Sequence, residues 1–219
     1  DQTELLRNDL VSNPQLDIVN AGNGDDIIYG QAGSDLLYGH TGNDYIDGGI
    51  GNDGLRGGEG NDTLFGRSGN NWLIGDMGND TLIGGDGNDT IIAGLGNDIV
   101  VSGLGNDTLK SGQGSNTFLW LANELGTDTI ENFTYGEDKI DLIDLLGLES
   151  DQSLDQYLSI NFEGGDTIIS IDTNLNGNEK QDIILSDTDL SSHAKQSIIN
   201  TLFTKLDENE GLFSSISVE

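Results

Sequence analysis

A single large apolar residue recurs every nine residues between residues 21 and 119, in eleven consecutive units. The first six residues of each unit are mostly polar and rich in glycine. A polar turn followed by a short segment with one inward-facing apolar side chain is typical of a turn and a short β-strand. With Ala21 as position 1, the apolar residue stands at position 8. These residues are Ile28, Leu37, Ile46, Leu55, Leu64, Leu73, Leu82, Ile91, Val100, Leu109 and Phe118.

The fixed period predicts how the units pack. Each unit can bury its apolar side chain only against its neighbours, so repeats of this kind stack into a solenoid. Two units form one coil of 18 residues, and the stacked coils form two parallel sheets around a thin core of position-8 residues. Position 4 is glycine in every unit, which indicates a tight turn. We therefore predict an all-β fold whose main part is a parallel β-roll.

Position 6 places a side-chain oxygen at the same point of every unit. Oxygen-only ligands suit calcium, which also accepts backbone carbonyls from turns. Zinc is disfavoured because the chain has two histidines and no cysteine. The predicted ligands are Asp26, Asp35, Asp44, Asp53, Asp62, Asn71, Asp80, Asp89, Asp98, Asp107 and Asn116, with Asp17 at position 6 of a degenerate preceding unit.

Alternate units lie above one another, so a calcium ion would bind between two position-6 side chains and nearby turn carbonyls. The complete Asp pairs are 26/44, 44/62, 62/80, 80/98, 35/53 and 89/107. Asn71 and Asn116 offer a carbonyl oxygen without a charge, which weakens the three pairs that contain them. Asp17 could pair with Asp35. We predict about six to nine bound calcium ions.

The composition agrees with a cation-dependent fold. The chain carries a net charge of −31, and only 34% of its residues are hydrophobic. Such chains are usually disordered, so the repeat predicts a chain that folds when a cation neutralises it. The acidic charge excludes nucleic acid as a partner. The absence of cysteine excludes disulfides, and no apolar stretch approaches the 18 residues needed for membrane insertion.

Residues 57–65 (GGEGNDTLF) and 84–92 (GGDGNDTII) resemble the calcium-binding nonapeptide of RTX proteins. The resemblance implies a right-handed parallel β-roll that folds on calcium binding outside the cell. It also implies export by the type I secretion machinery of Gram-negative bacteria. Gln31, His40, Arg67 and Asp76 depart from the family pattern because they replace glycine at position 2.

The second half of the chain extends the resemblance. Residues 126–133 and 136–142 resemble the segment that follows RTX arrays in secreted proteases, alginate epimerases and adhesins. The order of the later motifs resembles the secretion-target region of large biofilm adhesins. We therefore divide the chain into an N-terminal entry (1–20), a calcium-binding β-roll (21–119) and a capping and secretion-target region (120–219).

Three structural expectations concern this last region. An apolar plug closes the open end of the roll, and its residues are Ile130, Phe133, Ile140, Leu142 and Leu145. The loop 172–177 begins like an EF-hand loop, but it has no Glu twelve residues on, which favours a hairpin loop over a calcium site. Helical spacing of apolar residues predicts one helix within 191–206, with an N-cap at Ser191 or Ser192.

These features predict a calcium-dependent folding and type I secretion domain at the C-terminus of a large secreted or surface adhesin. We expect a monomer that is not itself an enzyme, because no catalytic motif is present. One alternative is the RTX module of a secreted protease, lipase or epimerase. Another is a carbohydrate-binding module, for which Arg56, Arg67 and Trp72 are the candidates. An ice-binding face is disfavoured because position 3 holds a single threonine.

Overall fold

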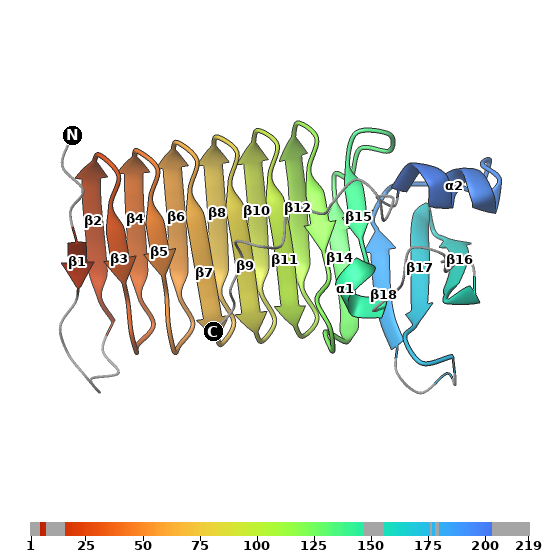
Figure 1. Ribbon diagram of the computed structural model, residues 1–219, viewed down its shortest axis with the longest axis horizontal. Coiled ribbons are helices and arrows are strands. Elements are labelled where there is room, and N and C mark those ends of the chain that lie inside the picture. The colour runs from red at the N-terminus through yellow and green to blue at the C-terminus, as the bar shows by residue number, and fades with distance from the viewer. Residues whose placement is uncertain (1–4, 8–15, 147–155, 176, 178–179, 203–219) are drawn as a thin grey trace.

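A computed structural model describes residues 5–7, 16–146, 156–175, 177 and 180–202 of the chain. The molecule is a row of stacked β-coils with a smaller group of strands and helices at the C-terminal end (Figure 1). The strands form one sheet of eight strands and one sheet of ten. The fold is thus a β-solenoid of about seven turns, which confirms the predicted β-roll.

The eight-stranded sheet contains the first strand of the chain and then every second strand of the roll. Its order is β1 (Leu5–Arg7), β3 (Ile27–Tyr29), β5 (Tyr45–Asp47), β7 (Thr63–Ser68), β9 (Thr81–Asp86), β11 (Ile99–Leu104), β13 (Thr117–Leu119) and β15 (Lys139–Asp141). All neighbouring strands in this sheet are parallel.

The ten-stranded sheet begins with the other strands of the roll. These are β2 (Ile18–Asn23), β4 (Leu36–Thr41), β6 (Gly54–Glu59), β8 (Trp72–Met77), β10 (Thr90–Leu95), β12 (Thr108–Gln113) and β14 (Gly126–Glu131). The sheet continues through β18 (Lys180–Leu185), β17 (Asp166–Asp172) and β16 (Leu158–Glu163). The last two join antiparallel, and β17 and β18 flank the loop for which a hairpin was predicted.

The register follows the predicted 18-residue coil. Ile28 pairs with Ile46 in one sheet, and Leu37 pairs with Leu55 in the other. All eleven position-8 side chains lie between the sheets and are at most 1% exposed. Each coil therefore buries two large apolar side chains against its neighbours, as the nine-residue period predicts.

Most strands are longer than the sequence suggests. Instead of three residues they span six, running from position 7 to position 3 of the next unit. The reason is the backbone at position 2, where φ is positive in every unit, for example 123° at Gly58 and 74° at Asp76. This bends the chain without ending the ladder, because Gly58 still pairs with Asp76. The turn itself is only three residues long.

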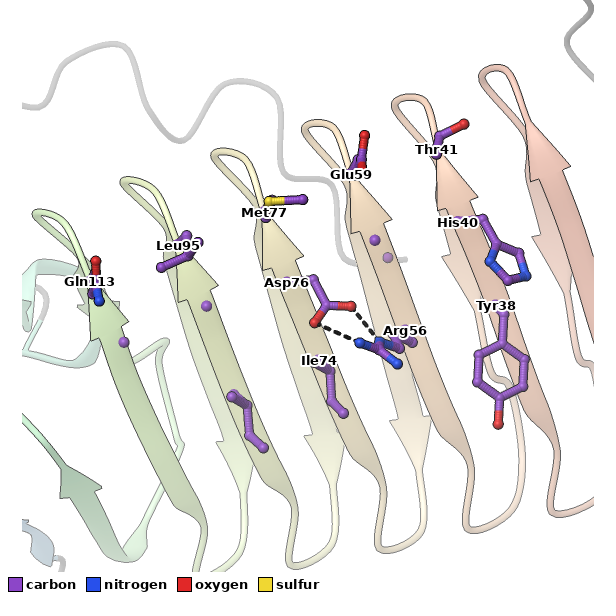
Figure 2. Close-up of a pocket in the computed structure, with 15 residues that line it drawn as sticks. Tyr38, His40, Thr41, Arg56, Glu59, Ile74, Asp76, Met77, Leu95 and Gln113 are labelled. Atoms are coloured by element: carbon purple, nitrogen blue, oxygen red, sulfur yellow. Dashed lines mark hydrogen bonds and ion pairs between the residues drawn. The ribbon is translucent and has the colours of Figure 1, made fainter.

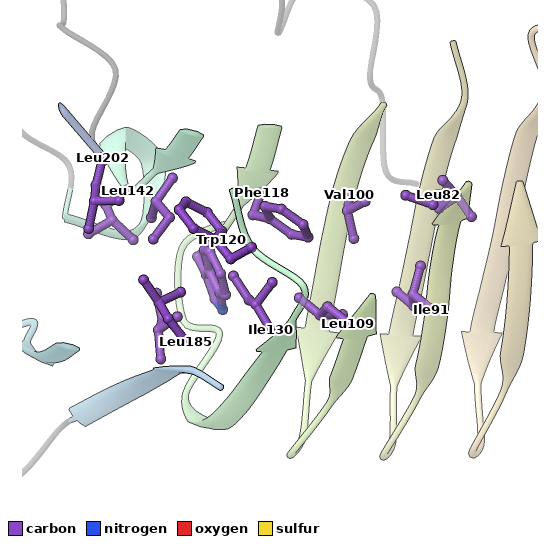
Figure 3. Packing of buried hydrophobic residues seen from close by; sticks show 14 of the residues in the cluster. Leu82, Ile91, Val100, Leu109, Phe118, Trp120, Ile130, Leu142, Leu185 and Leu202 are labelled. Carbon is purple, nitrogen blue, oxygen red and sulfur yellow. The ribbon is translucent and has the colours of Figure 1, made fainter. Parts of the chain in front are cut away.

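The C-terminal region is continuous with the roll. The predicted plug residues Ile130, Phe133, Ile140, Leu142 and Leu145 are at most 7% exposed and belong to the same cluster as the roll core. Trp120, which the sequence analysis did not single out, is fully buried among them (Figure 3). Strands β14 and β15 extend both sheets by one more coil.

The described residues contain two short helices rather than the single predicted one. The first, α1 (Ile143–Leu146), lies in the predicted capping region, for which no helix was predicted. Asp144 in its first turn favours a helix N-terminus. The second, α2 (Lys195–Leu202), lies within the predicted helix but starts after Ala194, so the predicted serine N-caps are wrong, and residues 203–206 lie outside the described residues. Neither helix has the length and apolar character needed to traverse a lipid bilayer.

Candidate calcium sites

The position-6 side chains lie in the turns between strands, where the chain passes from one sheet to the other. The nine Asp residues and both Asn residues are at most 3% exposed. Asp17 is partly buried at the N-terminal end of the series. Alternate residues stack into two files, so the structure brings the twelve predicted residues together in the order that the 18-residue coil requires.

One carboxylate oxygen of each Asp from Asp35 to Asp107 fixes the register between successive coils. Oδ1 of Asp44 accepts a hydrogen bond from the backbone N–H of Asp26 at 2.8 Å, and Oδ1 of Asp62 accepts one from Asp44 at 2.8 Å. The same bond recurs along both files, and it begins at Asp17, whose N–H donates to Asp35. Asn71 and Asn116 maintain it through their amide oxygens, each at 3.0 Å.

The other carboxylate oxygen, Oδ2, is buried without a hydrogen-bond donor among the described residues. This holds for Asp35, Asp44, Asp53, Asp62, Asp80, Asp89, Asp98 and Asp107. A buried anionic oxygen without a partner is strongly unfavourable. Eight of them in register favour a compensating positive charge beside each one.

The backbone leaves an oxygen-lined cradle beside each Oδ2. At Gly30, a Cβ atom would lie 2.8 Å from Oδ2 of Asp35 and 2.5 Å from the carbonyl oxygen of Gly48, one coil further on. At Gly48, a Cβ atom would likewise lie 2.6 Å from Oδ2 of Asp53, which is too close for a side chain. Position 1 is therefore small because carboxylate and carbonyl oxygens converge there. Calcium coordinates both kinds of oxygen.

Burial makes the ladder costly without a cation. Desolvation raises the pKa of Asp53, Asp62 and Asp89 to about 6, that of Asp80 to about 7 and that of Asp107 to about 8. Backbone hydrogen bonds oppose this shift, and neighbouring carboxylates add to it. Within the described residues, no three Asp, Glu, His or Cys side chains gather into a metal-binding group. Sites here must therefore include backbone carbonyls, which suits calcium better than zinc.

The ladder has two further members that the sequence analysis missed. Oδ1 of Asp128 accepts the N–H of Asp107 at 2.8 Å, and Oδ1 of Asp138 accepts that of Asn116 at 2.9 Å. They were missed because their separations are 21 and 22 residues instead of 18. A signal was present: GTDTI (126–130) and GEDKI (136–140) repeat the glycine, aspartate and apolar residue of positions 4, 6 and 8.

These two residues differ from the rest at Oδ2. In Asp128 this oxygen accepts hydrogen bonds from Trp120 Nε1 (2.7 Å), Gln181 Nε2 (2.8 Å) and Ser102 Oγ (3.2 Å). In Asp138 it accepts them from Ser111 Oγ and the N–H of Thr134, both at 2.7 Å. Ser102 and Ser111 occupy position 1, where most units have glycine. Protein donors thus surround the last two carboxylates, which we call the closing rungs.

The three candidate carbohydrate-binding residues do not all lie on one sheet. Arg56 and Trp72 lie on the ten-stranded sheet and Arg67 on the eight-stranded sheet. Each arginine is also engaged by a carboxylate, Arg56 by Asp76 and Arg67 by Asp47.

Residues 20–118 match the RTX calcium-binding nonapeptide repeat family in five overlapping windows, at 20–55, 47–82, 56–91, 74–109 and 83–118. No curated protein matches the chain. The array is therefore made of RTX calcium-binding repeats, and it forms the β-roll described above.

Several solved structures are similar. Two are the R3 and R2 subunits of the AlgE6 mannuronan C5-epimerase of Azotobacter vinelandii, each 20% identical. The R3 match covers 95% of this chain and 89% of that one with a TM-score of 0.29, and the R2 match covers 69% and 92% with a TM-score of 0.36. The extracellular lipase LipA of Serratia marcescens is 17% identical with a TM-score of 0.28. That match covers 87% of this chain and 41% of the lipase.

Proposed function

We propose that this chain is a calcium-dependent folding and type I secretion module of a larger extracellular protein. The observation that carries the proposal is the row of eight buried Oδ2 atoms without a hydrogen-bond donor. In the cytosol, where free calcium is scarce, these carboxylates repel one another and keep the chain unfolded and able to be threaded through a transporter. Outside the cell, millimolar calcium exceeds the dissociation constants typical of extracellular calcium sites.

The thermodynamic argument is one of linkage. A cation that binds only the folded chain adds its binding free energy to the stability of the fold. With a net charge of −31 and few hydrophobic residues, the chain has little other means of offsetting the entropy of folding. Oδ1 of each Asp preserves the register between coils, and Oδ2 with the adjacent turn carbonyls would hold the cation.

We expect the calcium sites to differ in affinity. We propose that the six complete Asp pairs bind calcium most tightly. The pairs that contain Asn71 or Asn116 offer one fewer negative charge, and affinity at oxygen sites follows ligand charge. Asp17 is less buried than the other residues, so the pair that it forms with Asp35 is expected to be the weakest.

For the whole protein, we propose a secreted or surface adhesin, because the order of motifs after the roll resembles the secretion-target region of such proteins. The module itself would act as a monomer without catalytic activity. Export through a type I system would bring the C-terminal region out first, so that calcium folds the chain progressively and opposes its return.

Circular dichroism and calorimetry test the proposal on the full chain. In chelator we expect a largely unfolded spectrum, and in about 5 mM calcium a β spectrum with several ions bound per chain. Magnesium at the same concentration is the control, because it dehydrates reluctantly and prefers rigid octahedral sites. An unchanged β spectrum in chelator and in calcium would contradict the proposal.

A second candidate function is binding of an acidic polysaccharide, favoured by a groove of about 700 Å³ on the outer face of the ten-stranded sheet. Figure 2 shows Tyr38, His40 and Arg56 along it, with Arg56 paired to Asp76. Titration with alginate oligomers in calcium would test this candidate. An Arg56→Ala variant should bind more weakly, and absence of binding by the unchanged chain would dismiss it.

A further inference from the structure

The groove of about 700 Å³ on the outer face of the ten-stranded sheet has a regular construction. Its lining comes from β4, β6, β8, β10 and β12, which are neighbours in the sheet, so the groove follows the axis of the roll. Position 2 is glycine in β6, β10 and β12, and no side chain fills the space there. Two rows of side chains form the walls (Figure 2), and we call the space between them the outer groove. The wall residues are Tyr38, Arg56, Ile74 and Ile92 at position 9 and Thr41, Glu59, Met77, Leu95 and Gln113 at position 3.

The charged residues of the outer groove lie toward its N-terminal end. Arg56 and Glu59 belong to β6, and Arg56 forms an ion pair with Asp76 of β8. A ligand that complements this distribution carries charge at one end and uncharged groups along the rest of its length. On β10 and β12 the lining residues are all uncharged, and they are Ile92, Gly94, Leu95, Gly112 and Gln113.

The uncharged part of the outer groove exposes aliphatic side chains. Met77 and Leu95 are each 45% exposed, and Ile74 and Ile92 are half-buried. Neighbouring apolar side chains that are open to solvent indicate a binding surface, above all in a chain with a net charge of −31. The gaps between branched aliphatic side chains suit compact apolar groups such as methyls. The outer groove therefore favours a ligand that carries methyl groups.

The strands give the outer groove a regular repeat. Successive strands are about 4.8 Å apart, and the lining residues recur at that interval along the groove. The sugar rings of an extended glycan follow one another at a similar interval, so that each ring could lie over one strand. An extended peptide advances about 3.3 Å per residue, so its residues would not stay in step with the strands. The repeat therefore favours a glycan over a peptide as the occupant.

Arg56 can bind one carboxylate of such a glycan. Its Nε and Nη2 donate to Asp76, yet its side chain remains 54% exposed. A guanidinium has five N–H donors, so donors remain for a ligand. A glycan with a carboxylate on every sugar would also bring carboxylates against Ile92 and Leu95, where the loss of hydration is not compensated.

We propose that the outer groove binds a linear glycan in which a single acidic sugar is followed by uncharged sugars that carry methyl groups, as in deoxy or acetylated sugars. The carboxylate binds Arg56, and the methyl groups pack on Ile74, Ile92 and Leu95. The inference rests on the second candidate function, binding of an acidic polysaccharide, and specifies which kind of acidic chain the groove selects.

Calorimetry in calcium tests the proposal on the full chain. The probe is an oligosaccharide of deacylated gellan, a linear glycan whose repeat combines a single uronic acid with a methyl-bearing deoxy sugar. The comparison is an alginate oligomer of equal length, which has a carboxylate on every sugar and no methyl groups. We expect the gellan fragment to bind about tenfold more tightly, equivalent to about 1.4 kcal/mol.

A matched pair of variants tests the place of the methyl groups. Leu95 and Leu104 both stand at position 3 and are each 45% exposed, but Leu104 lies on β11 in the eight-stranded sheet. Leu95→Ser should weaken binding of the gellan fragment about fivefold, equivalent to about 1 kcal/mol. Leu104→Ser should change it less than twofold. Arg56→Gln should weaken binding of both oligosaccharides, because both use the same carboxylate anchor.

Equal affinity for the two oligosaccharides would overturn the proposal and leave the second candidate function standing. If neither binds while circular dichroism shows that calcium folds the chain, both fail. If Leu95→Ser and Leu104→Ser weaken binding of the gellan fragment equally, the methyl groups do not lie in the outer groove and the proposal fails. Circular dichroism of each variant in calcium confirms that a loss of binding is not a loss of the fold.

Discussion

The roll and the coil that closes it use the same carboxylate in two ways. In both regions, Oδ1 of an Asp accepts the N–H of the residue one coil earlier. In eight Asp residues of the roll, Oδ2 has no donor among the described residues, whereas in Asp128 it has three. One oxygen thus sets the register, and we expect the hydrogen-bonding of the other to determine whether the coil needs a cation.

The closing rungs obtain their donors from outside the repeat. Trp120 lies in the connection after β13, and Gln181 comes from β18, 53 residues beyond Asp128. The longer coils, of 21 and 22 residues, bring these elements into position. Protein donors therefore surround Oδ2 in the closing coil, and we expect its strand edges to serve as a template on which the coils of the roll stack when calcium binds.

Removing calcium should produce the largest difference in stability between the roll and the closing coil. Without a cation, the buried Oδ2 atoms of residues 35–107 destabilise every coil that contains them, while Asp128 and Asp138 keep their donors. In chelator, hydrogen exchange should lose nearly all protection in strands β2 to β11 and retain it in β14, β17 and β18. Uniform loss along the whole chain would contradict the distinction between roll and closing coil.

Protonation of the buried carboxylates at low pH should stabilise the roll in part, as calcium is proposed to do. The pKa values of Asp53, Asp62 and Asp89 are raised from 3.8 to about 6, and those of Asp80 and Asp107 to about 7 and 8. A raised pKa means that the folded chain binds more protons than the unfolded one. The stability from these groups is complete below pH 3.8 and lost as the pH rises through 6 to 8.

Calcium-free protein should therefore show more β structure by circular dichroism at pH 5 than at pH 8. In excess calcium the order should reverse, because protons then compete with the bound cation. A calcium-free spectrum that is the same at both pH values would show that the buried carboxylates of the roll do not control its folding.

Asp128→Asn is the sharpest single change in the closing coil. It places an NH₂ group where Trp120, Gln181 and Ser102 all donate, which leaves buried donors facing a donor. We expect a loss of about 3 kcal/mol or more in the free energy of unfolding. Because no cation is involved, urea titrations in chelator and in calcium should show a similar loss in the closing coil.

Asp62→Asn is the matched change in the roll. Asn already stands at the equivalent position in Asn71, so the fold accommodates the amide. The substitution removes a buried charge, so the calcium-free chain should lose little stability. Calcium affinity should fall about tenfold in calorimetry, which is about 1.4 kcal/mol. The reverse change, Asn71→Asp, should raise calcium affinity, and identical binding curves for all three proteins would rule out these residues as ligands.

The periodic parts of the molecule could be predicted from sequence, and the parts that break the period could not. Leu64 and Asp62 are placed by spacing alone, because each coil repeats the environment of the last. The strand residues at positions 1 to 3 were assigned to turns because glycine suggests a turn, although here it bends a continuing strand. The role of Asp128 depends on partners as distant in sequence as Gln181, which a local pattern does not contain.

The smallest predicted effect concerns Ser111, whose hydroxyl donates to Oδ2 of Asp138 at 2.7 Å. Ser111→Ala removes this donor but leaves a methyl group, which position 1 tolerates at Ala93. We expect a loss of about 1 kcal/mol of stability in chelator, measured by urea denaturation. Thr134 still donates to the same oxygen, so the rung is weakened rather than opened.

Calcium should recover part of that loss, because Oδ2 of Asp138 then keeps only the Thr134 donor and is closer in character to the donor-free oxygens of the roll. Ser159→Ala, at an exposed position on β16, is the control and should change stability by less than about 0.5 kcal/mol. If the loss at Ser111 were the same in chelator and in calcium, a missing donor would not be enough to turn a closing rung into a calcium-responsive one. The shape of the longer coil, in addition to the hydroxyl, would then exclude the cation.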